Sequence, residues 1–329
     1  MIEVKDLRVD FWLPGKRLQA VRGVSFEIGD DEIVGLVGES GSGKSVTAAA
    51  LLQLHRPPQA AVSGSILTDG VESSSLKLSR LPAYRSEHFG YIAQEPSQSF
   101  DPLYTIERNF LEMFRIKNPK ISKKESRVRA VALLNEVGIA RPEERLRGFP
   151  HQFSGGMLQR IMIALALGGE GRVLIADEPT TALDVTVQAQ IVRLLLDLKK
   201  KRHFSVLFIS HDLELVSAVA DRILVMYGGL ILEAGRAEEI RRRPLCPYTQ
   251  ELLKSILHPG IIKKTEECHT ITGSPPDPLN PEPGCPFEPR CPKRFAACKK
   301  TVPPLKGSNH LYRCLLSETQ LTAEGADCG

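Results

Sequence analysis

The sequence predicts an α/β fold built around a phosphate-binding loop, and three observations support this prediction. First, residues 38–45 (Gly-Glu-Ser-Gly-Ser-Gly-Lys-Ser) fit the pattern G-x-x-x-x-G-K-S/T. Second, an apolar segment at 32–37 predicts a buried strand before the loop, and residues 46–52 predict a helix after it. Third, further apolar segments predict buried strands that lead into polar side chains, at 89–93, 173–178 and 205–209.

The loop has the chemistry that binding of an anion requires. Glycine lets the backbone wrap tightly, so that successive N–H groups point inward. The N-terminus of the following helix adds its positive dipole end. We expect Lys44 to reach the β- and γ-phosphates of a nucleotide and the Ser45 hydroxyl to bind Mg²⁺. The alternative is a glycine-rich turn that matches by chance, and the later motifs argue against it.

Length and composition indicate a globular protein. A chain of 329 residues is long enough for about two domains. Its 42% apolar and 25% charged residues are ordinary values, and the net charge is +4. No basic block is dense enough to indicate a nucleic-acid partner. No segment approaches the ~20 apolar residues of a membrane helix, and no signal peptide is evident. We therefore expect a cytosolic protein, for which any membrane role would come from docking onto another subunit.

Other elements interrupt the predicted core. Residues 1–30 alternate apolar and polar side chains around Pro14-Gly15, which predicts antiparallel strands. A helical insertion is predicted at about 95–160, with Val128, Val131, Leu134 and Val137 on one helix face. Gly228-Gly229 predicts a hairpin. After about residue 243 the chain is rich in proline, which excludes long helices from most of that stretch. A frayed polar tail is expected from about Ser317.

Four polar side chains stand at the ends of predicted strands, where ligands bind in α/β folds. Asp177 is expected to hold Mg²⁺ and Glu178 to polarise the attacking water. Gln94 can orient water or reach Mg²⁺, and His211 can hydrogen-bond a γ-phosphate oxygen. Taken alone, Gln94 and His211 are better explained as ordinary polar residues at strand ends, and their value as site residues comes from their position in the series.

A second anion site is predicted at Ser154-Gly155-Gly156. Ser154 can cap the helix that runs through residues 161–167, and the glycines leave its N-terminal N–H groups bare. A simple capped helix is the alternative. Because this site has no lysine of its own, it is expected to bind phosphate held by another subunit.

The resemblance is to an ABC-transporter nucleotide-binding subunit, over residues 1 to about 245. It rests on the series of the phosphate loop, Gln94, Ser154-Gly155-Gly156, Asp177-Glu178, Ala182-Leu183-Asp184 and His211. The resemblance implies an ABC-type phosphate-loop NTPase core with an antiparallel β subdomain and the helical insertion. It implies that Ser154 and Gly156 close on the ATP of a partner, that Asp184 lies at the dimer interface, and that His211 is a switch histidine. Phe11 best matches the adenine-stacking aromatic, with Trp12 second. The residues implied to bind ATP and Mg²⁺ are Phe11, Gly38, Ser40, Gly41, Ser42, Gly43, Lys44, Ser45, Val46, Gln94, Ser154, Gly155, Gly156, Asp177, Asp184 and His211.

A narrower resemblance, to the dipeptide/oligopeptide importer ATPases, rests on the region around residues 153–157, residues 176–190 and the segment from Cys246 to Cys314. All seven cysteines lie in the last quarter of the chain, and in a reducing compartment clustered cysteines indicate a metal. The resemblance implies that a 4Fe-4S cluster is held by Cys285, Cys291, Cys298 and Cys314. The spacing C-x5-C-x6-C-x15-C lacks the close pairs of a zinc site, so zinc is second and four unligated thiols are third. Cys246, Cys268 and Cys328 are not expected to be ligands.

The resemblance thus implies a nucleotide-binding domain at 1–245 and a loop-rich iron–sulfur appendage at 246–329. It implies an ATPase that powers peptide import, peripheral on the cytoplasmic face of the membrane. The expected partners are a second, homologous ATP-binding subunit, two membrane permeases and an external solute-binding protein, with no nucleic acid. The alternatives are nickel or oligosaccharide as cargo, or a soluble ABC ATPase without a transport role.

Overall fold

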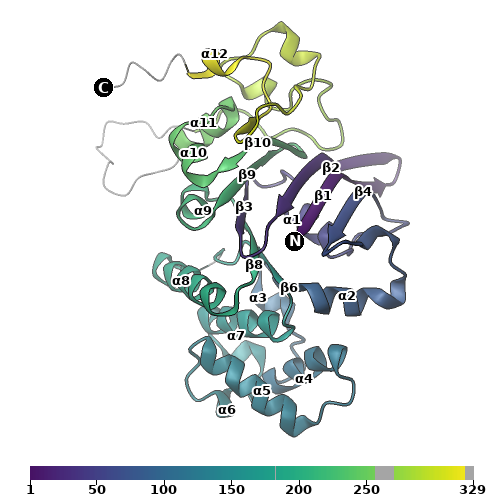
Figure 1. Ribbon diagram of the computed structural model, residues 1–329, viewed down its shortest axis with the longest axis vertical. Coiled ribbons are helices and arrows are strands. Elements are labelled where there is room, and N and C mark those ends of the chain that lie inside the picture. Colours follow the sequence, from purple (N-terminus) through teal and green to yellow (C-terminus); the bar gives the residue numbers. More distant parts are fainter. Residues whose placement is uncertain (182, 256–269, 323–329) are drawn as a thin grey trace. The chain divides into compact units, whose positions relative to one another are not determined.

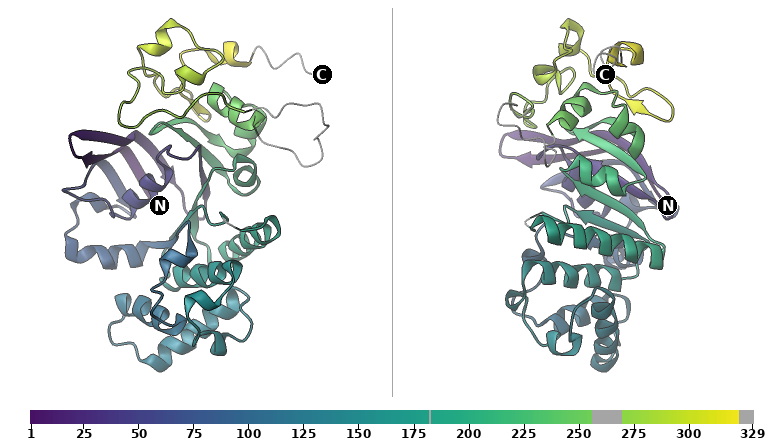
Figure 2. Two further views of the ribbon diagram at one scale, coloured as in Figure 1. Left: turned by 180° about the vertical axis from the view of Figure 1, so that it is seen from behind. Right: turned by 90° about the vertical axis from the view of Figure 1, so that its left-hand side faces the viewer.

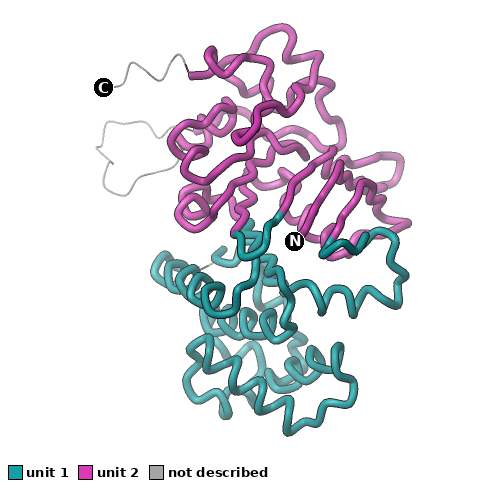
Figure 3. The backbone as a smooth tube through the Cα atoms, viewed as in Figure 1, with its two compact units in different colours: residues 1, 28–32, 68–209 teal, residues 2–27, 33–67, 210–329 magenta. Residues whose placement is uncertain are grey.

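The structure is a computed structural model, which describes residues 1–181, 183–255 and 270–322. The chain divides into two compact units, each built from separate stretches of sequence (Figure 3). Unit 1 contains residues 1, 28–32 and 68–209, and unit 2 contains residues 2–27, 33–67 and 210–329. The described part of the cysteine-bearing C-terminal region therefore belongs to the same unit as the phosphate loop.

Unit 2 begins with the predicted hairpin. The strands β1 (Ile2–Leu13) and β2 (Lys16–Ile28) flank Pro14-Gly15, where Gly15 has a φ of 71°. In β1 the side chains of Ile2 and Val4 are buried, and so are those of Leu7 and Val9, which follow Asp6 with its φ of 46°. Each half of the strand therefore alternates with a period of two. The strand β4 (Ala60–Thr68) lies next to β1 on the other side. The prediction of a hairpin within residues 1–30 is confirmed.

A second group of strands in unit 2 supports the phosphate loop. Their order is β11-β10-β9-β3, and the strands are β3 (Ile33–Val37), β9 (Arg222–Tyr227), β10 (Leu230–Arg236) and β11 (Leu311–Tyr312). β3 runs parallel to β9, and β10 returns antiparallel to β9 through Gly228-Gly229, which confirms the predicted hairpin. The helices of this unit are α1 (Lys44–Leu51), α9 (Leu213–Val219), α10 (Ala237–Arg242), α11 (Pro247–Lys254) and α12 (Glu318–Thr322).

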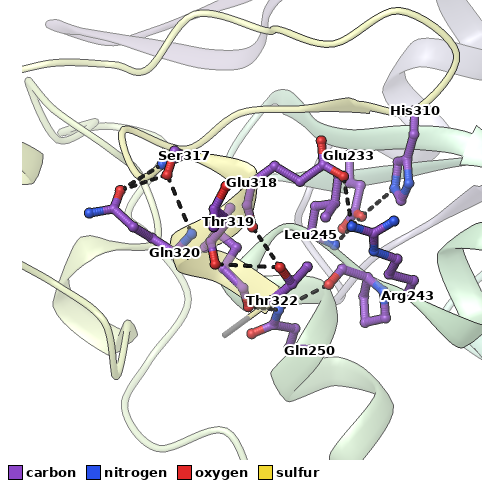
Figure 4. Close-up of polar contacts among 12 residues, drawn as sticks. Glu233, Arg243, Leu245, Gln250, His310, Ser317, Glu318, Thr319, Gln320 and Thr322 are labelled. Carbon is purple, nitrogen blue, oxygen red and sulfur yellow. Dashed lines mark hydrogen bonds and ion pairs between the residues drawn. The ribbon is translucent and has the colours of Figure 1, made fainter. Parts of the chain in front are cut away.

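The C-terminal region of unit 2 is loop-rich over 270–317, as predicted, with the short turns η4 (Glu288–Arg290) and η5 (Ala296–Lys299). The expected frayed tail is wrong for α12, because Leu321 is buried against Leu245 and Tyr312. An ion pair of 3.0 Å between Arg243 and Glu318 holds the same helix (Figure 4).

A buried carboxylate joins three segments of unit 2. Glu233 of β10 has no exposed surface and accepts hydrogen bonds from the backbone N–H groups of Leu245 and Cys246. Its third partner is His310 Nε2, at 2.7 Å (Figure 4). Glu233 thereby fixes the chain that enters α11 against the sheet and against the segment before β11.

Unit 1 contains three parallel strands in the order β8-β7-β6. They are β6 (Phe89–Ile92), β7 (Val173–Asp177) and β8 (Ser205–Ser210), and all three segments were predicted as buried strands. The helix α8 (Val185–Arg202) follows β7. Short elements precede β6, namely β5 (Val71–Glu72), η1 (Ser73–Ser75), η2 (Leu78–Arg80) and α2 (Leu81–His88).

The predicted helical insertion is present between β6 and β7. It consists of α3 (Pro96–Ser99), α4 (Ile106–Lys117), α5 (Lys123–Glu136), α6 (Pro142–Arg145), η3 (Pro150–Gln152) and α7 (Gly155–Gly168). Both views in Figure 2 show α4–α6 gathered at the end of unit 1 that is remote from its strands (labelled in Figure 1). The predicted face of α5 is wrong in part: Val128 is 64% exposed, and the buried positions are Ser126, Ala130, Leu133 and Leu134. A strict three-residue repeat drifts off the 3.6-residue period of a helix.

Candidate functional site

The phosphate loop lies between β3 and α1, and its glycines are required by close backbone neighbours. Gly38 and Gly43 have φ values of 155° and 107°. A Cβ at Gly38 would lie 2.0 Å from the carbonyl oxygen of Met226, and one at Gly43 would lie 2.5 Å from that of Ala20. Only glycine fits against these backbones, so the loop can wrap tightly at both positions.

Lys44 and the start of α1 supply positive charge to the loop. The Lys44 side chain is buried, and its Nζ donates to the carbonyl oxygens of Gly38 and Glu39, at 2.8 and 3.0 Å. In the described residues, no side chain caps the N-terminus of α1. Its first N–H groups therefore have the arrangement that binds phosphate. Ser45 is exposed at the same helix start.

The two candidate adenine-stacking rings differ in their surroundings. Phe11 is half-buried and contacts His55 edge-on, with ring centroids 5.0 Å apart. Trp12 is 54% exposed, and the Arg17 guanidinium lies 5.8 Å from its ring centroid. The assignment of Phe11 over Trp12 stays a prediction.

In unit 1, β7 ends at Asp177, and a residue missed by the sequence analysis holds it. Asp177 is buried, and Tyr91 Oη from the neighbouring strand β6 donates to Asp177 Oδ2 at 3.3 Å. Burial, together with the charge of Asp177, raises the pKa of Tyr91 to about 12. The phenol therefore stays protonated and remains a donor to this carboxylate.

Glu178 follows in a left-handed conformation, with a φ of 48°. Its carboxylate oxygen Oε2 accepts hydrogen bonds from Gln94 Nε2 at 3.3 Å and from Thr181 Oγ1 at 2.8 Å. The predicted pair of Gln94 and Glu178 is thus brought together, and Thr181 is a further partner that sequence reasoning missed. A hydroxyl three residues after a strand-end carboxylate was the available signal.

The Ser154-Gly155-Gly156 segment begins α7, and Ser154 caps it by accepting from the Met157 N–H. Ser154 and Gly155 are exposed. Asp184 caps α8 in the same way, accepting from the Val187 N–H at 2.9 Å. A Cβ at Gly156 would lie 3.0 Å from a methyl group of Val187, so these two helix starts are neighbours in unit 1. Their contact with a partner's ATP stays a prediction.

His211 follows β8 directly and is exposed. The next residue, Asp212, caps α9 by accepting from the Leu215 N–H at 3.0 Å. The sequence predicted this strand-end position for His211, and its role as a switch stays a prediction.

The four candidate cysteine ligands line one small cavity in unit 2. Cys285, Cys291, Cys298 and Cys314 all border it, with Cys246 as a fifth thiol. Burial raises the pKa of Cys285 to about 11 and that of Cys291 to about 12. Among residues 1–181, 183–255 and 270–322, no three His, Cys, Asp or Glu side chains are arranged to hold a metal ion. The geometry of these described residues therefore supports neither the predicted 4Fe-4S cluster nor the zinc alternative as a formed metal site. Cys268 and Cys328 lie outside the described residues.

Comparisons with known proteins assign the class first. The ABC transporter family matches residues 21–181, and the family "Oligopeptide/dipeptide transporter, C-terminal region" matches residues 232–298. Among solved structures, the dimeric post-hydrolysis state of an ATP-binding cassette bound to ADP and Pi matches with a TM-score of 0.64 and 26% identity, over 72% of this chain and 99% of that one. The chain is therefore an ABC ATPase with the cassette fold.

Relatives narrow the class. The dipeptide transport ATP-binding protein DppD of Bacillus subtilis is 42% identical over 97% of this chain and 95% of its own length. The oligopeptide transport ATP-binding protein OppD of the same organism is 46% identical over 87% and 80% of the two chains. The chain belongs to this family of dipeptide/oligopeptide-transport ATP-binding proteins. Within its described residues, no helix has the length and apolar character to cross a membrane.

Proposed function

We propose that this chain is the ATP-hydrolysing subunit of a dipeptide or oligopeptide importer, peripheral on the cytoplasmic face of the membrane. The observation that carries the proposal is one chain that combines a complete phosphate loop and a strand-end Asp177-Glu178 pair with a C-terminal region of the peptide-transporter type. Nickel or oligosaccharide cargo, and a soluble role without transport, are the alternatives.

The residues divide the work of ATP hydrolysis. Lys44 and the first N–H groups of α1 bind the phosphates, and Phe11 stacks on the adenine. Ser45, Asp177 and Gln94 would hold Mg²⁺, which neutralises phosphate charge when bound. Glu178 polarises the attacking water, and His211 hydrogen-bonds the γ-phosphate. The hydrogen bonds from Gln94 and Thr181 orient the Glu178 carboxylate for this role.

The exposed start of α7 supports a second ATP-binding subunit as a partner. Ser154 and Gly156 would bind the nucleotide of that subunit, with Asp184 at the interface. A homologous rather than identical partner is proposed, with two membrane permeases and an external solute-binding protein completing the importer.

We further propose that the cysteine cavity holds a 4Fe-4S cluster. The support is that four cysteines from separate loops border one cavity, and four cysteine thiolates are the usual ligand set of a 4Fe-4S cluster. Cys285, Cys291, Cys298 and Cys314 would be its ligands.

Uptake of labelled di-, tri- and pentapeptides tests the function, in cells whose only copy of the chain carries Glu178→Gln. We expect loss of uptake for at least one peptide length, with ATP binding retained in the purified variant. Glu170→Gln is the matched control, because among the described residues the Glu170 side chain forms only an exposed ion pair with Arg129. Unchanged uptake of every peptide would exclude peptides as the cargo, and nickel and oligosaccharides would then be tested. ATPase activity without any membrane partner would favour a soluble role.

A further inference from the structure

The phosphate loop forms an ion pair with Arg290, a residue of the C-terminal region. Arg290 lies at the end of η4, and its guanidinium makes a two-pronged ion pair with Glu39, the second residue of the loop. Arg290 Nη1 donates to Glu39 Oε2 at 2.6 Å, and Arg290 Nη2 donates to Glu39 Oε1 at 3.1 Å. The two residues are 251 positions apart in sequence.

The guanidinium is fully committed to this position. Its three remaining N–H groups donate to the carbonyl oxygens of Thr272 and Ile271, at 3.0 and 3.1 Å, and to Tyr227 Oη at 3.0 Å. All five donors of the side chain are therefore used. The Arg290 side chain is 5% exposed and that of Glu39 is 22% exposed, so water screens the pair weakly.

Glu39 in turn contacts the lysine that binds phosphate. Its backbone N–H donates to Tyr248 Oη at 3.0 Å, and its carbonyl oxygen accepts from Lys44 Nζ at 3.0 Å. Tyr248 packs against Tyr227 and Phe287, with ring centroids 4.4 and 5.2 Å away. Glu39 is thus fixed by its side chain, its N–H and its carbonyl, and two of these contacts come from residues after 245.

The ion pair also compensates a negative charge within the phosphate loop. Glu39 places a carboxylate in a loop whose task is to bind a polyanion, and an uncompensated negative charge there would oppose the phosphates. Arg290 supplies the compensating charge in a geometry that also fixes the carboxylate.

We propose that Arg290 is a positioning residue for ATP binding, which neutralises Glu39 and holds the phosphate loop from the C-terminal region. Arg290 does not touch the nucleotide and acts through Glu39. Cys291 directly follows the turn η4 that contains Arg290, and the first residue of this turn, Glu288, donates its N–H to the Cys285 carbonyl oxygen at 3.0 Å. The same few residues therefore link the loop-rich region to nucleotide affinity. The inference rests on the ATP-binding activity of the family.

The test compares ATP binding and steady-state hydrolysis in the purified full-length chain. Arg290→Met should weaken ATP binding and raise KM at least about fivefold, while kcat changes less than about twofold. Arg294→Met is the matched control, because Arg294 lies nearby and is exposed, and among the described residues its side chain donates only to the Pro289 carbonyl. It should bind ATP like the parent.

A charge-removal variant separates positioning from general damage. In the Arg290→Met background, adding Glu39→Gln should recover at least half of the lost affinity on a logarithmic scale, because it removes the carboxylate that Arg290 neutralised. Wild-type affinity in Arg290→Met, or a double variant as weak as the single one, overturns the proposal. If Arg290→Met fails to fold, the uncharged pair Glu39→Gln with Arg290→Gln serves instead, with affinity within about threefold of the parent expected and a larger loss overturning it. A parent chain that binds no ATP would contradict the family function itself.

Discussion

Single hydrogen bonds orient the carboxylates of Asp177 and Glu178 in this ATPase. The hydrogen bond from Tyr91 could not be predicted from the sequence, because its segment predicts only a buried strand that leads to Gln94. Its role appears once β6 and β7 pair in parallel, which aligns Tyr91 with Ile175 and brings its hydroxyl to Asp177. Asp177, Glu178 and Gln94 could be named as candidate site residues from the sequence because strand ends in α/β folds are where ligands bind.

Tyr91→Phe should weaken Mg²⁺ binding, so that hydrolysis requires more Mg²⁺. The variant removes one hydrogen bond to the proposed metal ligand Asp177 and leaves the ring in place. Outer-shell partners of this kind are worth about tenfold in metal affinity. We therefore expect the Mg²⁺ concentration for half-maximal ATPase activity to rise about tenfold, with a smaller change in kcat.

The control for that measurement is Tyr84→Phe. This variant also removes a tyrosine hydroxyl in the same unit, but one that is hydrogen-bonded to Thr68 instead of Asp177. Its Mg²⁺ dependence should match the parent. Equal Mg²⁺ dependence in Tyr91→Phe and the parent would show that Asp177 is positioned without the phenol.

At the scale of elements, helix existence was predictable and helix orientation was not. The insertion at about 95–160 is helical, yet the face assigned to α5 placed the exposed Val128 in the core. Apolar residues on a helix surface mislead a periodicity argument, because packing partners and not side-chain polarity alone select the buried face. Conversely, Ser126 and Ala130 of α5 are buried although neither is a large apolar residue.

The start of α11 depends on one buried carboxylate, and Glu233→Ala tests it. Removal of Glu233 leaves the N–H groups of Leu245 and Cys246 without an acceptor and His310 without its partner (Figure 4). Unsatisfied buried groups of this kind cost about 1–3 kcal/mol each. We expect the free energy of unfolding to fall by about 2–4 kcal/mol in denaturant titrations.

Glu238→Ala is the comparison for Glu233→Ala. Glu238 lies on the next element, α10, and forms an exposed ion pair with Arg242 at 3.2 Å. Exposed pairs four residues apart on a helix contribute about 0.3–0.5 kcal/mol. A loss in Glu233→Ala no larger than that of Glu238→Ala would contradict the anchoring role of Glu233.

For the whole molecule, the sequence predicted the components and missed a long-range connection. The phosphate loop, the strand-end residues and the cysteine cluster each follow from local patterns. The ion pair between Glu39 and Arg290 joins positions that no local pattern relates, and only the folded chain brings them together. The region after 245 is therefore part of the support of the loop, although its composition suggested a separate appendage.

The cysteine cavity gives the last prediction, which concerns the metal content of the intact chain. Protein purified without oxygen should contain about four iron atoms and four acid-labile sulfides per chain. Cys298→Ser should lose most of both, because it removes one of the four proposed ligands, whereas Cys246→Ser should retain them. Cys246 is the matched control, since its thiol borders the same cavity and is buried but is not a proposed ligand. Zinc in place of iron, or iron retained in Cys298→Ser, would contradict the assignment.

Removal of iron by a chelator under reducing conditions should then lower the thermal midpoint of the parent, because a bound group that links four separate positions of the loop-rich region stabilises the folded chain.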